Sequence, residues 1–167
     1  MKYTFNEQEK LIRRTAGDKT SLMPVEDLIL VRLMTNFTSL YKEHRTRLLQ
    51  QFGLNETQFL ALTLIYYQKN RSIQPSVLSE MLGSSRTNIT RVSDDLEKKG
   101  WIERQLMKSD RRAYLLNLTV KGVNVLEEFL PHQWKLISDL FSVLTPEESE
   151  FLQVILRKLT NHIEQIQ

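Results

Sequence analysis

The residues best suited to chemistry lie in one short stretch, SSRTNITRVSDDLEKKG, which spans residues 84 to 100. Ile89, Val92 and Leu96 recur there at helical spacing and define an inward-facing apolar stripe. The side chains left outside carry hydroxyl, amide and guanidinium groups, and no acid precedes Asp94. Arginine and asparagine can each bond a base edge bidentately, and threonine offers both a hydroxyl and a methyl group. The pattern predicts a helix that reads the major groove of double-stranded DNA.

The direction in which this helix meets DNA follows from where its acids begin. Its first two turns are free of acids, its last turns are mixed, and the positive end of a helix dipole favours phosphate. We therefore expect the N-terminal end to enter the groove. An ordinary solvated helix is the alternative, but it would carry glutamate and lysine four residues apart. The DNA contacts expected from this helix are Ser84, Ser85, Arg86, Thr87, Asn88, Thr90 and Arg91.

A short helix is expected immediately before it, from Pro75 to Gly83. Proline suits the first turn of a helix, where its missing N–H would be unpaired, and glycine commonly ends one. Only residues 83 to 85 connect the two helices, so they must cross steeply, as in a helix-turn-helix. Leu78 and the small Ser79 would supply the surface on which the second helix packs.

Two strand-like runs, WIERQLM and YLLNL, follow this unit and flank the basic segment KSDRRA. They predict a β-hairpin with a long, basic tip. Arginines at such a tip would reach one groove further along the duplex, where a narrow minor groove attracts them. We expect Arg111 and Arg112 to contact DNA there and Asp110 to orient a neighbouring arginine. The alternative is that the two arginines only keep an exposed loop soluble.

Longer helices are expected on both sides of this unit. Apolar residues recur at helical spacing from residue 24 to about 52, from 55 to 69 and from 119 to 144. A last helix should start at Thr145, because this N-cap residue is followed by a proline and, at the third helical position, by Glu148. The chain is therefore read as helices interrupted by one hairpin.

These elements predict a mainly α fold with a small β-hairpin wing, which is a winged helix-turn-helix. The terminal helical segments carry more apolar surface than one winged helix can cover, which favours a homodimer. Residues 1–23 look like a polar, flexible N-terminal arm. We expect a DNA-binding domain at residues 54–118 and a helical dimerisation region made of residues 24–53 and 119–167.

Composition sets limits on the classes of function. The 167 residues include no cysteine, so disulfides and thiolate metal sites are excluded. No apolar run approaches the roughly 18 to 20 residues of a membrane span, and the N-terminus lacks a signal-peptide pattern, so we expect a soluble, cytoplasmic protein. Eight basic and five acidic residues lie between Arg86 and Arg112, an excess equal to the whole chain's net charge of +3. Such local basic charge favours a polyanionic partner.

The sequence offers few catalytic or ligand-binding patterns. The sequence has no nucleotide-binding glycine pattern, no serine–histidine motif and no carboxylate cluster, so we expect neither an enzyme nor a cofactor. Aromatic residues and a cation could line a pocket for an aromatic acid between the first long helix and the winged helix, although at helical spacing they can equally be core. A lone histidine such as His44 is more often interior than a metal ligand, so we expect no metal site. The pocket candidates are Phe37, Tyr41, His44, Arg45, Phe59 and Tyr66.

The order helix, SSRTNITRVSDDLEKKGWIER, a wing containing SDRR, and then LNLTVKG resembles the MarR family of winged helix-turn-helix transcription regulators. The resemblance covers roughly residues 24 to 166, and NETQFLAL, SIQPSVLSEMLGSSRTN and EKKGWIER are most similar to its multidrug-efflux repressor branch. It implies a homodimer that binds a pseudo-palindromic operator and releases it when a small aromatic or weakly acidic effector binds. It also implies that residues 84 to 91 read the groove, that Arg112 enters the minor groove, and that Asp110 forms a salt bridge with Arg112.

Three functions are compatible with these features. The leading hypothesis is a repressor of efflux or stress-response genes. A regulator that activates virulence or stress genes by displacing other DNA-bound proteins would carry the same residues. A winged helix used only for protein interaction would instead present an apolar or acidic face on its second helix, which this sequence lacks.

Overall fold

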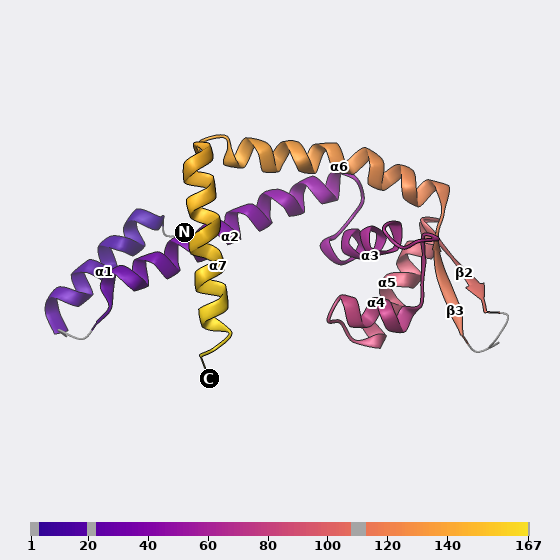
Figure 1. The fold of residues 1–167 in the computed structure, drawn as a ribbon, viewed down its shortest axis with the longest axis horizontal. Helices are drawn as coiled ribbons and strands as arrows, with labels where there is room; N and C mark the ends of the chain where they lie inside the picture. Colours follow the sequence, from indigo (N-terminus) through magenta and orange to yellow (C-terminus); the bar gives the residue numbers. More distant parts are fainter. Residues whose placement is uncertain (1–3, 20–22, 108–112, 167) are drawn as a thin grey trace. The chain divides into compact units, whose positions relative to one another are not determined.

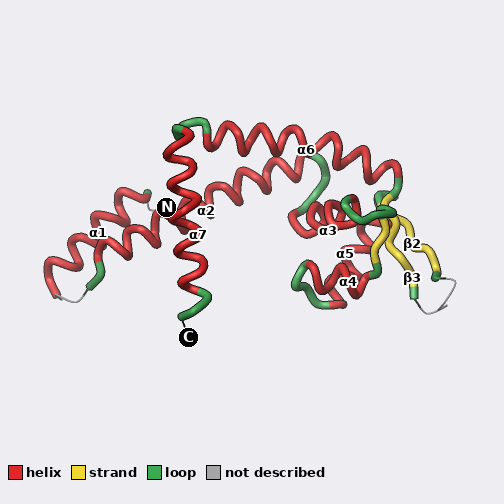
Figure 2. The backbone as a smooth tube through the Cα atoms, in the orientation of Figure 1, coloured by secondary structure: helices red, strands yellow, loops and turns green. Residues whose placement is uncertain are grey.

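The computed structural model describes residues 4–19, 23–107 and 113–166. The chain divides into two compact units, residues 1–55 and residues 56–167. Helices make up most of both units, and the strands belong to the second (Figure 2). This set of helices and strands confirms the expected mainly α fold with a small β-hairpin wing.

The first unit is a pair of packed helices, α1 (Phe5–Lys19) and α2 (Val25–Gln51) (Figure 1). α2 matches the helix expected from apolar spacing to within one residue at each end. α1 corrects the expectation that residues 1–23 form a flexible arm. A capping box starts it, because the Thr4 N–H donates to the Glu7 carboxylate at 2.6 Å and the Thr4 hydroxyl accepts from the Glu7 N–H at 3.4 Å. Few apolar residues mark this segment, so the apolar pattern alone misses it.

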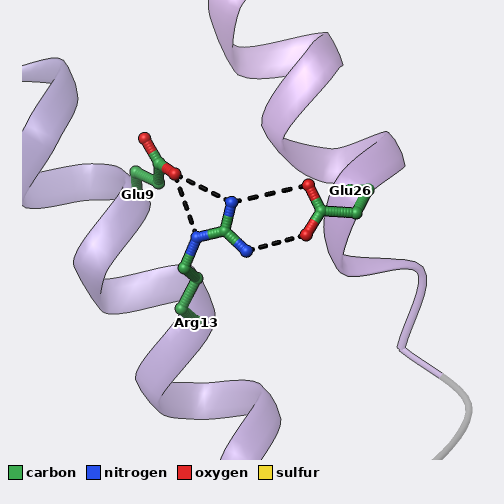
Figure 3. A network of polar contacts seen from close by, with 3 residues as sticks. All are labelled: Glu9, Arg13 and Glu26. Atoms are coloured by element: carbon green, nitrogen blue, oxygen red, sulfur yellow. Dashed lines mark hydrogen bonds and ion pairs between the residues drawn. The ribbon is translucent and has the colours of Figure 1, made fainter.

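An arginine fork joins the two helices of this unit (Figure 3). Arg13 of α1 donates from Nε to Glu9 at 2.9 Å and from Nη1 to Glu26 of α2 at 2.7 Å. The hydrogen bond that Arg13 donates to Glu26 raises the pKa of Arg13, and the same bond lowers the pKa of the Glu26 carboxyl. Because these side chains are exposed, the fork orients α1 on α2 more than it stabilises the fold.

The second unit combines helices with a three-stranded antiparallel sheet in the order β1-β3-β2. Figure 1 shows the three shorter helices gathered beside the sheet, followed by two long helices. The elements are α3 (Glu56–Tyr66), β1 (Ser72–Ile73), α4 (Pro75–Met81), α5 (Arg86–Lys98), β2 (Ile102–Leu106), β3 (Tyr114–Leu118), α6 (Val120–Phe141) and α7 (Pro146–Ile163).

Strands β2 and β3 form the expected hairpin. Ile102 pairs with Leu118 at its base, and Leu106 pairs with Tyr114 at the other end. β1 is an addition that the sequence analysis did not predict, because two residues are too few to show an alternating pattern. It pairs with the free side of β3, where Ile73 lies opposite Leu116. β2, the strand that follows α5 in the chain, therefore lies at one edge of the sheet.

The core of the second unit is built around α3. Phe59 of α3 meets Phe129 of α6 edge to face, with ring centroids 4.9 Å apart. α5 packs on α3, α4 and β2, so burial of its inner face fixes which of its side chains point outward. The almost fully buried apolar residues of this core are Leu62, Ile65, Leu78, Ile89, Leu96, Ile102, Leu116 and Leu126.

The start of α6 is seated on the residues that follow α5. The Thr119 hydroxyl donates to the Gly100 carbonyl at 2.7 Å and accepts from the Gly122 N–H at 3.1 Å, which caps the helix. A Cβ at Gly122 would lie 2.1 Å from the Trp101 carbonyl oxygen, so the backbones approach too closely for a side chain. The sequence LTVKG is thus explained by a cap and a close approach, which together hold the hairpin beside the end of α5.

α7 begins as expected and differs in burial from the other helices of the second unit. The Thr145 hydroxyl accepts from the Glu148 N–H at 3.2 Å, and the Glu148 carboxylate accepts from the Thr145 N–H at 2.8 Å, which confirms the capping box. No residue of α7 is buried in the single chain. Its exposed apolar side chains include Phe151, Ile155, Leu159 and Ile163. Among the described residues, no helix is long and apolar enough to cross a membrane.

Candidate nucleic-acid interface

The turn between α4 and α5 is fixed by one glycine and one serine. Gly83 has φ +55°, a left-handed conformation that side chains other than glycine rarely adopt. The hydroxyl of the buried Ser79 donates to the Ser84 carbonyl at 2.6 Å, and the Ser84 N–H donates back to the Ser79 carbonyl at 3.0 Å. A small residue at position 79 therefore does more than allow close packing. It holds Ser84, the middle residue of the turn, at a set position relative to α4.

Ser85 caps the N-terminus of α5. Its hydroxyl accepts from the Asn88 N–H at 3.2 Å and so occupies one of the unpaired donors of the first turn. The first turn of α5 contains no acid, as the sequence shows. The remaining N–H groups at this end are available to an anion such as a phosphate.

A chain of side-chain hydrogen bonds runs along the outward face of α5. The Asn88 amide donates from Nδ2 to the Ser84 hydroxyl at 2.8 Å and accepts at Oδ1 from Arg91 Nη2 at 3.2 Å. These three residues, predicted as DNA contacts, are thereby brought together and partly ordered in the absence of DNA. Arg86, Thr87 and Thr90 are exposed on the same helix, and Ile89, Val92 and Leu96 are buried as the helical pattern predicts.

The first acid of α5 is bound by an arginine of the sheet. Asp94 accepts a hydrogen bond from Arg104 of β2, and Glu97 lies 3.5 Å from the Arg104 Nη1. The Arg104 guanidinium also lies over the Tyr114 ring of β3, 5.2 Å from its centroid. Burial opposes the charge of Arg104, but the bond to Asp94 and the neighbouring charges outweigh it, so the pKa of Arg104 is raised.

The C-terminal end of α5 is tied to α3. The Lys99 ammonium donates to the Oε1 of the buried Gln58 at 3.1 Å and lies 4.4 Å from the centroid of the Trp101 ring. Burial lowers the pKa of Lys99, which the nearby Asp95 partly opposes. Lys99 therefore serves the packing of the helix end, whereas Lys98 is exposed to solvent.

The wing is described up to its tip. The Met107 N–H donates to the Ala113 carbonyl at 3.0 Å, which continues the β2–β3 ladder by one more bond. Asp110, Arg111 and Arg112, the three tip residues predicted to act at DNA, lie outside the described residues. Their assignment stays a prediction from the sequence.

The six pocket candidates divide between the two units. Phe37, Tyr41, His44 and Arg45 lie on α2, and Phe59 and Tyr66 lie on α3. Within the first unit, Phe37 is 48% exposed and His44 is also exposed, so the expectation that His44 is interior was wrong for the single chain.

The two candidates of the second unit have structural partners. Phe59 is buried against Phe129. The Tyr66 hydroxyl donates to Glu127 at 3.1 Å, and the Arg71 guanidinium lies 4.9 Å from the centroid of the Tyr66 ring. The bond to Glu127 raises the pKa of Tyr66. A shared ligand pocket for the six residues stays a prediction.

The sequence analysis missed the part played by Arg104. Its signal was present, because strand residues two apart share a face and Arg104 is two residues after the buried Ile102. An arginine on the inner face of an edge strand needs an acceptor. Apart from its neighbour Glu103, the acids within ten residues of it in the chain are Asp94, Asp95 and Glu97 of α5 and Asp110 of the wing tip.

Known proteins resemble the chain in both sequence and structure. The model of the MarR family matches residues 54–114. The transcriptional repressor MprA of Escherichia coli strain K12 is 45% identical over 144 residues, which cover 86% of this chain and 82% of MprA. A crystal structure of a MarR variant from Escherichia coli complexed with operator DNA superposes with a TM-score of 0.65 at 28% identity, covering 80% of this chain and 95% of that one. Sco3205 of Streptomyces coelicolor, crystallised with DNA, shares the fold with a TM-score of 0.72 at 24% identity, covering 87% of this chain and 92% of that one.

Proposed function

The chain belongs to the MarR family of transcription regulators, and we propose that it is a homodimeric repressor of efflux or stress-response genes that a small aromatic or weakly acidic molecule releases from DNA. DNA binding and regulation follow from family membership. The dimer, the operator symmetry, the effector and the direction of regulation are the proposed parts. The repressor MprA, 45% identical, supports the direction.

The observation that carries the proposal is the outward face of α5. Its first two turns present hydroxyl, amide and guanidinium groups, and Asn88 holds Arg91 in a defined orientation. Such groups can distinguish base pairs in the major groove, where each pair displays its own donors and acceptors. No large apolar side chain is exposed between residues 84 and 100, all of which the structure describes. This supports a nucleic-acid partner over a protein partner at this face.

Homodimerisation is supported by α7. This helix has no buried residue, and its apolar stripe of Phe151, Ile155, Leu159 and Ile163 is exposed in the single chain. A second copy would cover the stripe, and two-fold symmetry would match two half-sites about 34 to 36 Å apart. The pseudo-palindromic operator follows from the same symmetry.

The proposed effector acts by binding preferentially to one of two spacings between the DNA-reading helices of the two subunits. A molecule that binds better when the spacing does not fit the two half-sites lowers DNA affinity, and DNA lowers the affinity for that molecule by the same factor. An aromatic acid is proposed because Arg45 and the aromatic residues Phe37 and Tyr41 lie on the same helix, α2. The sequence resemblance implies the same chemical class.

The experiment that tests the proposed function is selection of bound fragments from the genomic DNA of the source organism by the purified full chain. Recovery of one symmetric sequence upstream of a small set of genes would support it, and recovery of random fragments would contradict it. Repeating the selection with a panel of aromatic carboxylic acids should release the recovered fragments. Release by none of them would contradict the effector class while leaving the DNA site established.

A further inference from the structure

One interaction links the DNA-reading helix to the wing by side chains. Arg104 lies in the middle of β2, the edge strand, opposite the buried Leu116 of β3. From there its guanidinium bonds Asp94 and approaches Glu97, both on α5, while its plane lies over the Tyr114 ring of β3. This group, Arg104 with Asp94, Glu97 and Tyr114, is called the α5–wing clasp.

The clasp joins α5 to the hairpin at the position where the angle between them is determined. Asp94 is three residues after Arg91, so it lies on the same side of α5 one turn beyond the last expected base contact. Tyr114 begins β3, at the end of the described ladder nearest the wing tip. A guanidinium is planar and presents its donors in a fixed fork, so it can set the angle between the two elements that it joins.

We propose that Arg104 is a positioning residue for DNA binding, which holds the β2–β3 hairpin at the angle to α5 that lets helix and wing engage one DNA site together. The proposal rests on the proposed function, because it concerns how that function is carried out. Arg104 acts through Asp94 and the wing and makes no base contact of its own.

Stability alone does not explain the clasp. The side chains of Arg104, Asp94 and Glu97 are 29%, 55% and 40% exposed, and ion pairs this exposed add little to the free energy of folding. The Arg104 Nε is buried without a hydrogen-bond partner among the described residues, which opposes folding. An arrangement that contributes little to folding and still joins two elements is better explained by the geometry that it imposes.

The clasp also explains the acid at position 94. A carboxylate on the outward side of α5 would repel the phosphates that this face is expected to approach. Bound to Arg104, its charge is neutralised locally, so the acid-free character of the first two turns extends in effect to the next one. Asp94 therefore stands at the position of α5 where Arg104 of the sheet needs a carboxylate to bond.

The decisive test compares two acids that are neighbours in α5. Asp94→Asn and Asp95→Asn each remove one negative charge, and simple electrostatics predicts tighter DNA binding for both. Asp95 is exposed and takes no part in the clasp. The probe is a fluorescently labelled duplex carrying the sequence recovered by genomic selection, with a scrambled duplex of the same composition alongside, in anisotropy titrations at one salt concentration.

We expect Asp94→Asn to weaken binding to the selected duplex about fivefold or more, and Asp95→Asn to leave it unchanged or tighter. Asp94→Glu, which keeps the carboxylate, should restore most of the affinity. Binding by Asp94→Asn that equals or exceeds that of the unchanged chain overturns the proposal. A wild-type chain that does not prefer the selected duplex to the scrambled one contradicts the proposed function instead.

Arg104→Lys distinguishes a positioning role of residue 104 from a direct contact with DNA. A measurement of thermal unfolding shows whether the variants are still folded. Lysine keeps the charge but not the fork or the stacking, so positioning predicts a loss similar to that of Asp94→Asn. A point contact between residue 104 and phosphate predicts little change and would overturn the proposal. Thermal unfolding followed by circular dichroism should give both variants midpoints close to that of the unchanged chain. A fall large enough to leave either variant partly unfolded at the titration temperature would overturn the positioning role.

Discussion

Asn88 shows how single side chains prepare the DNA-facing surface. Its amide is bonded on one side to Ser84 and on the other to Arg91, so both neighbours are oriented before any ligand arrives. Ordering a long arginine side chain in advance lowers the conformational entropy lost on binding. At the scale of residues, DNA reading depends on which groups meet the base edges and on how each group is held.

Arg91→Ala tests the account at this scale. Loss of a bidentate contact with a base should weaken binding to the selected duplex by about 1 to 3 kcal/mol and lower the ratio of selected to scrambled binding. Asn88→Ala should lower the same ratio, because Arg91 loses its orienting partner. Anisotropy titrations measure both. Lys98→Ala, an exposed residue at the far end of α5, is the control and should leave the ratio unchanged, and a similar result for Arg91→Ala would contradict the assignment.

At the scale of elements, the position of the hairpin depends on backbone contacts around α6. Thr119 caps α6 and reaches the Gly100 carbonyl, while Gly122 lies against the Trp101 carbonyl. These contacts bind the end of α5, the start of β2 and the start of α6 into one rigid corner. The α5–wing clasp then acts on a hairpin whose base is already fixed.

Gly122→Ala should destabilise this corner. A Cβ 2.1 Å from the Trp101 carbonyl oxygen forces the backbones apart, and overpacking of this kind costs about 1 to 3 kcal/mol. Gly83→Ala is the matched comparison, because its Cβ would meet no atom within 4 Å and only its φ of +55° is unfavourable. Chemical denaturation should therefore show the larger loss for Gly122→Ala. Equal losses, or none, would mean that the close approach is not present in solution.

The pairing of α1 with α2 should respond to acid. The bond from Arg13 lowers the pKa of Glu26, so the ionised carboxylate is favoured in the folded unit. The stabilisation is therefore present above the ordinary glutamate pKa of about 4.3 and is lost as pH falls through the lowered value. A nuclear magnetic resonance titration of the Glu26 carboxyl should give a midpoint below about 4.3, which Arg13→Ala should return to the ordinary value. A midpoint at or above the ordinary value in the unchanged chain would contradict the fork.

Local sequence signals explain which helices could be predicted. Apolar spacing places α2 and α5, and a short cap pattern places the start of α7, because both signals depend on residues a few positions apart. The capping box at Thr4 is also a local signal, but no strong apolar stripe follows it, so apolar spacing does not indicate a helix there. β1 depends on pairing with the distant β3. The position of Arg104 indicates that it needs an acceptor, but which acid supplies it depends on how β2 packs against α5, which no local pattern encodes.

At the scale of the whole molecule, the long helix α7 leaves an apolar stripe exposed in the single chain. α7 has no buried residue, and its apolar side chains recur four residues apart along one stripe. An exposed stripe of this length normally marks an interface. The proposed homodimer covers it and gives the two DNA-reading helices a fixed symmetry relation.

Ile155→Glu should disrupt the dimer by placing a charge in the centre of the stripe, where burial without a partner is unfavourable. Sedimentation velocity should then show a monomer, and affinity for a two-half-site duplex should fall by more than tenfold, because only one half-site is engaged at a time. Gln153→Glu adds the same charge on the other side of α7 and serves as the control. A dimer that persists in Ile155→Glu would place the interface elsewhere.

The central claim is that this chain reads a DNA sequence through α5, and its most direct measurement is the ratio of affinities for selected and scrambled duplexes at one salt concentration. Specific regulators bind their sites about a thousandfold or more tighter than other DNA, and we predict a ratio in that range for the unchanged chain. The affinity for both duplexes should also fall as salt rises, because phosphate contacts release counterions. A ratio near one, with the same salt dependence for both duplexes, would show charge attraction without sequence reading and would contradict the account.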